Sequence, residues 1–457
     1  MNKVLSIILA AGKGTRMKSD KIKVLHKVGG KTMLQHVIDN VETFSSRLAV
    51  IIGYQGQAVK KSINTDSDIS FFEQEEQLGT AHAVLQAKKD LIKHNGSVLV
   101  LFGDTPLLSK KSLEKLLFKH QQEKADCTVL TALMDNPTGY GRIIRDEDNE
   151  IIAIVEEKDA ATEEKNIKET NTGVCCFDSK LLLDDLENID NNNAQGEYYL
   201  TDAIAYLSKA NKKVQPLIID DNKEIIGIND RVNLAKAEKI IRERTNLKHM
   251  HNGVTIIDPS NTYIDSQVEI GSDTIIYPYT FIEGKSKIDQ HSIVGSHCRI
   301  VDSVIGEYAN INDHSLILES SIQAKVNVGP FAYIRPGCMV EYGAKIGDFV
   351  ELKKASIGKG SKVPHLTYVG NADIGEGTNI GAGTIFANYD GKDKHKTIVG
   401  NGVFIGSNTT IVAPVEIKDK GKTGAGAVVT KNVDKGTTVV GVPAHIFNKD
   451  NQDKGGN

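Results

Sequence analysis

The sequence predicts two folds in one chain, an α/β domain with a mainly parallel sheet and then a parallel β-helix. Three observations carry this prediction. Short apolar runs alternate with helix-like segments in the first half, an aliphatic residue recurs at every sixth position in the second, and one charged amphipathic segment lies between them. Alternating strands and helices are typical of a parallel sheet covered on both faces, and a long period of six is typical of a solenoid.

The first half contains four short apolar runs, at 4–10, 48–52, 69–72 and 98–102. Helix-like segments occur at 32–44, 80–92 and 111–120. Ligands of such sheets bind beyond the carboxyl ends of the strands. We therefore expect the chemistry of this half on the loops that follow the apolar runs.

The second half repeats an aliphatic residue with a period of six, beginning at Ile264, Ile270 and Ile276. Six is neither the 3.6 of a helix nor the 2 of a strand, so each unit is interpreted as one short strand and a turn, and three units as one triangular coil. The aliphatic side chains point to the axis and stack from coil to coil. The period is interrupted between Thr384 and Ile398, which predicts a loop there.

The segment 230–250 reads as one amphipathic helix and marks the predicted boundary. The expected domains are therefore 1–229 and 251–457, with 230–250 as a linker helix and a polar tail from 448. The chain has 55 Lys and Arg against 59 Asp and Glu, a net charge of −4, which argues against nucleic acid or an acidic membrane surface as a partner.

The apolar stretch at 4–10 is too short for a signal peptide or a membrane span, so we expect a cytoplasmic protein. The five cysteines are odd in number and show no paired zinc spacing. Reduced thiols are therefore expected, with the adjacent pair Cys175 and Cys176 filling a strand.

A glycine-rich loop follows the first apolar run and reads LAAGKGTRM at 9–17, with Lys23 shortly after it. Its spacing fits neither the P-loop nor the dinucleotide GxGxxG pattern. Small residues let backbone amides approach phosphates, and Arg16 and Lys23 supply positive charge. Taken alone, this loop is also compatible with a structural β-turn, and Asp104 after the fourth run with a turn residue that caps a strand.

Several motifs in a fixed order resemble the bacterial family of bifunctional N-acetylglucosamine-1-phosphate uridylyltransferases and glucosamine-1-phosphate acetyltransferases. They cover nearly the whole chain: LAAGKGTRM at 9–17, QLGTAHA at 77–83, FGDTPL at 102–107, PTGYGRI at 137–143, NAQGEYYLTD at 193–202, KVPHLTYVG at 362–370 and NIGAGTIFANYDG at 379–391. The resemblance implies an α/β nucleotidyltransferase domain of Rossmann-like type, followed by a left-handed parallel β-helix of hexapeptide repeats. It also implies acetyl transfer from acetyl-CoA to glucosamine 1-phosphate, then uridylyl transfer from UTP to N-acetylglucosamine 1-phosphate with release of pyrophosphate.

In the first domain, the resemblance implies that UTP and the sugar nucleotide contact Leu9, Ala10, Ala11, Gly12, Lys23, Gln74, Gly79, Thr80, Phe102, Gly103, Asp104, Gly141, Glu156, Asn171 and Asn229. Arg16 and Lys23 would face the triphosphate as catalytic cations. Asp104 and Asn229 would be the metal ligands, since two protein oxygens with phosphates and water are how Mg²⁺ is usually held. Asn229 could instead cap the linker helix.

In the β-helix, the resemblance implies a general base at His365, whose side chain suits removal of a proton from an amine near neutral pH. Glucosamine 1-phosphate would contact Arg335, Lys353, Tyr368, Asn379 and Lys394. Acetyl-CoA would contact Ala382, Asn388, Tyr389, Ser407, Ala425 and Gly441. Four other histidines of this half are interpreted as surface residues: His291, His297, His314 and His395.

Two positions depart from the pattern of the family. Ile22 stands where relatives commonly have proline, which removes a rigid φ before Lys23. Gly441 stands where some members place an arginine that meets the coenzyme, so Lys431 or Lys435 are alternative contacts.

The family assembles threefold, so the resemblance implies a homotrimer with acetyltransferase sites between chains. Two other interpretations stay open on the residues alone. The β-helix could be a structural or regulatory oligomerisation module, or both halves could be binding modules. His365 and the loop at 388–394 favour the enzyme, since a structural solenoid has no need to break its period there.

Overall fold

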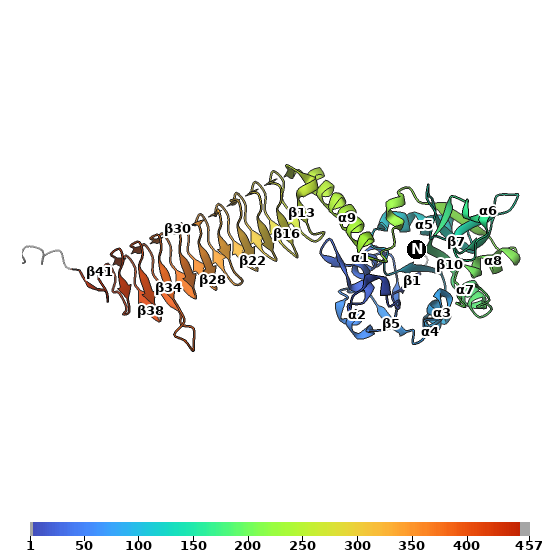
Figure 1. Cartoon of the computed structure of the whole chain (residues 1–457), viewed down its shortest axis with the longest axis horizontal. Coiled ribbons are helices and arrows are strands. Elements are labelled where there is room, and N and C mark those ends of the chain that lie inside the picture. Colours follow the sequence, from blue (N-terminus) through green and yellow to red (C-terminus); the bar gives the residue numbers. More distant parts are fainter. Residues whose placement is uncertain (1–2, 448–457) are drawn as a thin grey trace, which may run out of the picture. The chain divides into compact units, whose positions relative to one another are not determined.

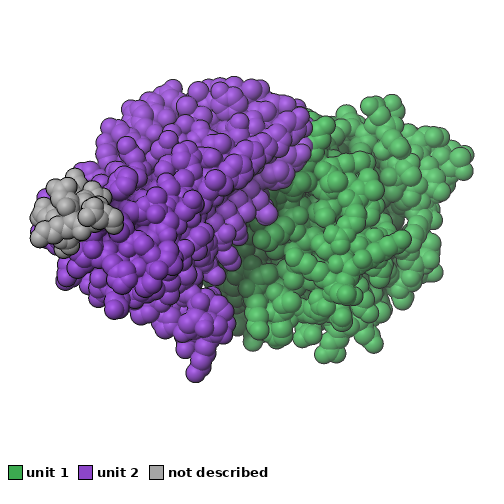
Figure 2. Space-filling model, turned by 60° about the vertical axis from the view of Figure 1, so that its left-hand side comes forward, with its two compact units in different colours: residues 1–241 green, residues 242–457 purple. Residues whose placement is uncertain are grey.

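The computed structural model describes residues 3–447, which belong to two compact units, 1–241 and 242–457 (Figure 2). The division falls inside helix α9 (Arg231–His251), the helix expected at 230–250. The polar tail expected from 448 lies outside the described residues. Within the described part of the chain, no helix is both long and apolar enough to cross a membrane.

The first unit is built on a sheet with the strand order β11-β7-β10-β6-β1-β4-β5 (Figure 1). The four expected apolar runs form its parallel part: β1 (Val4–Leu9), β4 (Arg47–Ile52), β5 (Ile69–Glu73) and β6 (Ser97–Phe102). The remaining strands are β7 (Cys127–Leu133), β8 (Arg142–Arg145), β9 (Ile151–Val155), β10 (Glu169–Asp178) and β11 (Val214–Ile218). Because β10 runs antiparallel to both β6 and β7, the sheet is mixed there.

Helices cover both faces of this sheet because alternate strand residues point to opposite sides. Leu5 and Ile7 of β1 pack in one apolar cluster with α3 (Thr80–Leu85), α4 (Lys88–Lys93), α7 (Ser179–Leu186) and α8 (Asp202–Lys209). Val4 and Ile8 pack in the other with α1 (Met33–Val41), α2 (Gly56–Ser62) and α5 (Lys110–Gln122). The expected α/β fold is confirmed.

The second unit is a parallel β-helix of three sheets with 12, 10 and 9 strands (Figure 1). We name each sheet after its first strand, and their first and last strands are β12 (Thr255–Ile256) and β42 (His445–Ile446), β13 (Tyr263–Ile264) and β40 (Val428–Val429), and β14 (Glu269–Ile270) and β38 (Val415–Ile417). The period-six residues stack as expected, since Ile264 lies opposite Ile282 and Ile282 opposite Ile300. This confirms the solenoid.

Breaks in the period of six correspond to coils of different length. Ile300 lies opposite Ile317, so this coil is one residue shorter than the coil from Ile282 to Ile300. Ile380 lies opposite Ile405, so the coil between them is longer and contains the loop expected between Thr384 and Ile398. The insertion is therefore a local excursion that leaves the stacking of the core intact.

Residues at the corners of the coils adopt left-handed backbone conformations, and several carry rings that stack along the solenoid. His297 and His314 stack with ring centroids 4.8 Å apart, Tyr279 extends the stack on one side, and Phe331 followed by Phe349 extends it on the other. The open end of the solenoid is closed by α9, where buried Asn246 donates hydrogen bonds to the carbonyls of Pro259 and Thr262.

Candidate functional sites

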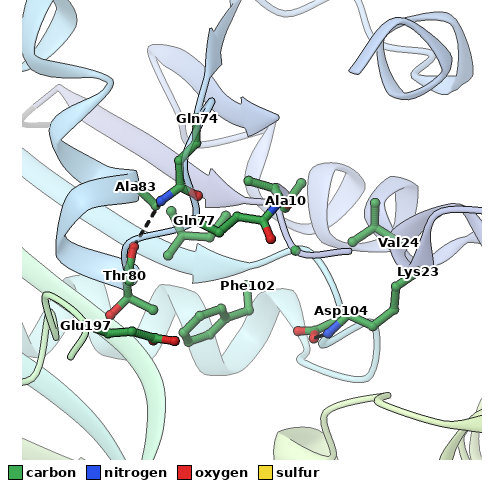
Figure 3. A pocket seen from close by; sticks show the side chains of 14 residues that line it. Ala10, Lys23, Val24, Gln74, Gln77, Thr80, Ala83, Phe102, Asp104 and Glu197 are labelled. Carbon is green, nitrogen blue, oxygen red and sulfur yellow. Dashed lines mark hydrogen bonds and ion pairs between the residues drawn. The ribbon is translucent and has the colours of Figure 1, made fainter. Parts of the chain in front are cut away.

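A cavity of about 270 Å³ lies at the carboxyl ends of β1, β5 and β6 (Figure 3). It brings together ten of the residues predicted to bind the nucleotide: Leu9, Ala10, Ala11, Gly12, Lys23, Gln74, Gly79, Thr80, Phe102 and Asp104. Their elements are far apart in sequence and meet because parallel strands present their carboxyl ends at one edge. Gly79 has a φ of +116°, and a Cβ there would lie 2.5 Å from the carbonyl oxygen of Tyr198, so only glycine fits.

Four further residues line this cavity that the sequence analysis missed, Val24, Gln77, Ala83 and Glu197. Gln77 donates to the carbonyl of Ala11 at 3.1 Å and so supports the loop after β1. Gln77, Ala83 and Glu197 lie inside motifs that the sequence analysis quoted, so the motifs contained the signal. Gly103 does not line the cavity, because it lies beneath the loop and donates to the carbonyl of Leu9 at 2.9 Å.

Asp104 and Asn229 direct their side-chain oxygens at one point, where the ammonium of Lys23 lies. Lys23 Nζ donates to Asp104 Oδ2 and, at 3.2 Å, to Asn229 Oδ1. Only 14% of the Lys23 side chain and 16% of the Asp104 side chain are exposed, so water screens their attraction weakly. The residue that caps α9 is Asp230, whose carboxylate accepts a hydrogen bond from the backbone of Asn233 at 2.8 Å. Asn229 therefore does not cap this helix.

The oxygens of Asp104 and Asn229 fit a hard cation, since a positively charged group already sits between them. In the described residues no cluster of three or more His, Cys, Asp or Glu side chains could hold a metal ion. A divalent cation at Asp104 would therefore take few ligands from the protein and the others from water and substrate phosphates.

Arg16 and Ile22, the two other positions singled out in the segment after β1, differ in burial. Arg16 is exposed on the short 3-10 helix η1 (Thr15–Met17) and does not line the cavity. Ile22 is buried, with a φ of −56° that lies in the range of proline. Burial of this side chain thus fixes the backbone before Lys23 in place of a proline ring.

A second cavity of about 180 Å³ adjoins the first, and Thr80 and Phe102 line both. It contains the predicted sugar contacts Gly141, Glu156 and Asn171. The sequence analysis missed its other lining residues, which are Gly139, Tyr140, Thr172, Gly173, Cys175, Leu200 and Thr201. Burial raises the pKa of Glu156, and a hydrogen bond from Thr201 at 3.3 Å partly offsets this.

A buried arginine supports the second cavity from below. Arg142 is 1% exposed and donates to Glu157 at 2.7 Å and to the carbonyl of Tyr140. These contacts tie the loop before β8 to the end of β9, which carries Gly141 and Glu156 respectively. Arg142 is shielded from water, so loss of Glu157, whose side chain is 29% exposed, would leave the charge of the buried arginine uncompensated.

A third cavity, about 500 Å³, lies along the β12 sheet of the second unit. It contains the predicted general base together with residues from both predicted ligand sets: His365, Asn379, Ala382, Ser407 and Ala425. Their strands are successive members of the sheet, β30 (Lys362–His365), β33 (Asn379–Ile380) and β36 (Phe404–Ile405). Neighbouring coils thus place His365 beside a surface that contains several glycine and alanine residues, Gly381, Ala382, Gly406, Gly424 and Ala425.

Asp348 holds the imidazole of His365 and was missed by the sequence analysis. The two residues lie opposite each other on adjacent coils, and His365 Nδ1 contacts Asp348 Oδ1. The hydrogen bond with His365 lowers the pKa of Asp348, so the carboxylate is ionised and can only accept. Nδ1 must therefore carry a hydrogen, which leaves Nε2 of the neutral ring free to accept a proton.

Three cations, Arg335, Lys353 and Lys394, lie close to one another on the β13 sheet and the long loop. The side chain of Lys394 and the charge of Arg335 lower the pKa of Lys353, because like charges disfavour the protonated form. Arg335 also contacts Glu351 at 2.9 Å. Such a concentration of positive charge is suited to a phosphate group.

The predicted ligand sets of the β-helix are divided between two sheets. Arg335, Lys353, Tyr368 and the loop residues Asn388, Tyr389 and Lys394 follow or belong to strands of the β13 sheet, namely β25 (Tyr333–Ile334), β28 (Glu351–Lys353), β31 (Tyr368–Gly370) and β34 (Ile385–Ala387). None of them lines the third cavity. Gly441, which follows β41 (Thr438–Val440), and the alternatives Lys431 and Lys435 do not line it either.

Known proteins resemble the chain over both units. Residues 5–224 match the nucleotidyl transferase family. A bifunctional protein GlmU of Clostridium beijerinckii is 49% identical over 436 residues, which cover 95% of this chain and 95% of the relative. Those of Syntrophomonas wolfei and a Geobacillus species are each 47% identical, over 96% and 99% of this chain and 97% and 98% of the relative.

Proposed function

Because the chain belongs to the family of bifunctional GlmU proteins, we propose that its two units hold separate active sites for two group transfers. The chain is a bifunctional transferase of UDP-N-acetylglucosamine synthesis. It moves acetyl from acetyl-CoA to glucosamine 1-phosphate and then uridylyl from UTP to the acetylated sugar phosphate, with release of pyrophosphate. The joined cavities of the first unit, which share Thr80 and Phe102, are the observation that carries this assignment of sites.

In uridylyl transfer, UTP occupies the first cavity and N-acetylglucosamine 1-phosphate the second. The backbone of 9–12 and Gln74 hold the uridine end, while Glu156 and Asn171 hold the sugar. Where the cavities join, a phosphate oxygen of the sugar attacks the α-phosphorus and pyrophosphate leaves from the opposite side. The nucleophile is already anionic, so catalysis consists of positioning and of charge neutralisation by Lys23 and Arg16.

Asp104 and Asn229 hold Mg²⁺ in this proposal, because their oxygens converge on a point that suits a hard cation. The ion, when bound, neutralises charge on the triphosphate and on the departing pyrophosphate. Arg16 is exposed and does not line the first cavity, so contact with the triphosphate requires a change of its side-chain rotamer or of its loop.

In acetyl transfer, the 2-amino group of glucosamine 1-phosphate attacks the thioester carbonyl. Nε2 of His365 takes the proton from the amine and returns it to the departing CoA sulfur, while Asp348 keeps the ring oriented. Arg335, Lys353 and Lys394 bind the phosphate of the sugar, and Tyr368 and Asn379 its ring. Acetyl-CoA contacts Ala382, Asn388, Tyr389, Ser407, Ala425 and Gly441.

The acetyl-transfer site is completed between chains of a homotrimer in this proposal. The predicted contact residues are divided between the β12 and β13 sheets, so they do not all lie on one face of the solenoid. This division supports a site that a second chain completes. A regular solenoid face can also pack on copies of itself about a closed axis. Sedimentation that finds a stable monomer with full acetyl-transfer activity would overturn this part of the proposal.

A single reaction mixture tests the proposed function. The purified chain is incubated with glucosamine 1-phosphate, acetyl-CoA, UTP and Mg²⁺, and the release of both CoA and pyrophosphate is measured. We expect release of both products. Because all four reagents are soluble, we also propose that the enzyme works in the cytoplasm. Pyrophosphate release from N-acetylglucosamine 1-phosphate without any CoA release would instead favour the β-helix as a structural module.

A further inference from the structure

Lys23 occupies the point on which the oxygens of Asp104 and Asn229 converge. Its ammonium donates to Asp104 Oδ2 and to Asn229 Oδ1, the latter at 3.2 Å, and both charged side chains are largely shielded from water. An ammonium and a divalent cation cannot share this point, because they are alike in charge and both require the same oxygens.

The main chain on both sides of the contact restricts where Lys23 can go. Gly14 has a φ of +65°, and a Cβ there would lie 2.4 Å from the Cβ of Lys23, so the glycine loop packs directly on the lysine. On the other side, the backbone of Ile228 donates to the carbonyl of Asp104 at 3.0 Å and fixes the segment that carries Asn229. The lysine can therefore leave the pair of oxygens only by moving its flexible end, and the first cavity is the space beside it.

We propose that Lys23 is the resident cation of the metal site in the nucleotide-free enzyme, so that the divalent ion binds only together with the triphosphate. This inference rests on the proposed function, in which Asp104 and Asn229 are metal ligands. The free site offers a divalent ion two protein oxygens that already have a counter-charge. An incoming triphosphate supplies both new oxygen ligands for the metal and a new anionic partner for Lys23, which turns from Asp104 to the phosphates.

The exchange predicts that removing Lys23 strengthens one interaction and weakens another. A Lys23→Met enzyme loses a phosphate contact, so its affinity for UTP falls. The same substitution leaves the carboxylate of Asp104 without a counter-charge, so the affinity of the variant for a free divalent ion rises. We expect a rise of about tenfold or more, the change in an equilibrium constant that corresponds to one pKa unit. A lysine with only a structural role would not produce a gain in metal affinity.

Binding of Mn²⁺ to the full-length enzyme, measured by electron paramagnetic resonance, tests the exchange with and without a non-hydrolysable UTP analogue. We expect the wild type to bind Mn²⁺ at this site only when the analogue is present. Lys23→Met should bind Mn²⁺ without the analogue, and Lys23→Met combined with Asp104→Asn should lose that binding. Lys23→Arg keeps the charge and should show no gain, while Lys21→Met removes an exposed lysine of the same loop and should behave as the wild type.

The outcomes separate this inference from the function on which it rests. If Lys23→Met binds free Mn²⁺ no more tightly than the wild type, while Asp104→Asn abolishes binding in the presence of the analogue, the exchange is wrong and the metal assignment stands. If Asp104→Asn leaves analogue-dependent Mn²⁺ binding unchanged, both are wrong. An unchanged thermal transition of the first unit, measured by calorimetry, shows in each case that the unit carrying the substitution is folded.

Discussion

The two units build their sites in different ways. In the first unit, loops after β1, β5 and β6 meet at one edge of a sheet and line the first cavity, and residues next to β8, β9 and β10 line the second, so a single chain builds both cavities. In the β-helix each coil contacts only the coils before and after it, and the candidate ligands are spread over two sheets. A doubly wound sheet brings its loops together at one edge, whereas a solenoid presents flat faces, which is why we propose that a second chain completes its site.

This difference also decides how functional residues are spaced in the sequence. Lys23 meets Asp104 and Asn229 across large gaps in the chain, because the topology of the sheet brings them together. His365 meets Asp348 from the adjacent coil, at the regular distance of the repeat. Contacts in the β-helix are thus readable from the period, and contacts in the first unit are not.

The largest expected effect separates the two sites through the metal. Asp104→Asn keeps the shape of the side chain and removes the charged ligand, so uridylyl transfer should fall by about 10⁴-fold, the equivalent of the several kcal/mol that a metal ion contributes. Acetyl transfer should continue at the rate of the wild type, because the sites lie in different units. Pyrophosphate release that is unchanged across a titration of Mg²⁺ would show that Asp104 is not a ligand.

The reciprocal variant acts on the β-helix alone. His365→Ala should lower acetyl transfer by roughly 10² to 10⁴, the range for loss of a general base, and leave uridylyl transfer unchanged. Release of CoA and of pyrophosphate, each with its own substrate, measures the two rates.

A mixture of His365→Ala and Asp104→Asn proteins should convert glucosamine 1-phosphate into UDP-N-acetylglucosamine by diffusion of the intermediate. Failure of the mixture would indicate direct transfer between sites.

Asp348→Asn sharpens the view that contacts between coils build the second site. The amide cannot hold His365 as an ionised carboxylate does, so kcat for acetyl transfer should fall by about 10- to 100-fold, as is common for residues that orient a functional imidazole. KM for glucosamine 1-phosphate should change little, since Asp348 is not one of the residues proposed to contact this substrate. A change in KM with unchanged kcat would place Asp348 in substrate binding instead.

The sequence predicted what depends on local patterns. The apolar runs of β1, β4, β5 and β6 and the period-six stack were found because neighbouring residues determine them. The antiparallel position of β10 between β6 and β7 was not found, because the choice of strand partner depends on residues distant in sequence. The convergence of Asp104 and Asn229 came from the resemblance alone, and the lysine between their oxygens had no sequence signal.

The missed residues of the sites divide in the same way. Asp348 could have been found, since it stands one coil before His365 in a regular repeat. Tyr140, Cys175 and Thr201 could not have been placed in one cavity from spacing, because they come from three distant segments of the first unit.

The cations on the long loop of the β-helix should have a moderate effect. Lys394→Ala removes one of three neighbouring positive charges, so KM for glucosamine 1-phosphate should rise about tenfold with a smaller change in kcat. Lys396→Ala is a matched control on the same loop, because that lysine is paired with Asp373 at 2.5 Å and is not among the causes of the Lys353 shift. Equal effects of the two substitutions would mean that the loop contributes only general positive charge.

The smallest effect concerns stability and should appear in the first unit only. Asp185 lies in α7, and burial together with the charge of Asp184 raises its pKa to about 6 from an ordinary 3.8. Its Oδ2 atom is buried and has no hydrogen-bond partner in the described chain. The folded unit therefore holds the proton of Asp185 more tightly than the unfolded chain does. The contribution of this carboxyl to stability is greatest below pH 3.8 and is lost as the pH rises through about 6.

Asp185→Asn removes this ionisation, so its advantage over the wild type should be small near pH 4, grow through pH 6 and be constant above pH 7. Calorimetry across this range should show a rise of roughly 2 to 4 °C at pH 8 in the transition of the first unit, as expected for about 1 kcal/mol in a unit of this size. The transition of the β-helix should not move, because the two units are separate compact bodies. Asp184→Asn should give a smaller shift of the same sign, since Asp184 is the secondary cause. A gain that is independent of pH would assign the effect to packing, and a matching shift in the β-helix would show that the two units unfold together.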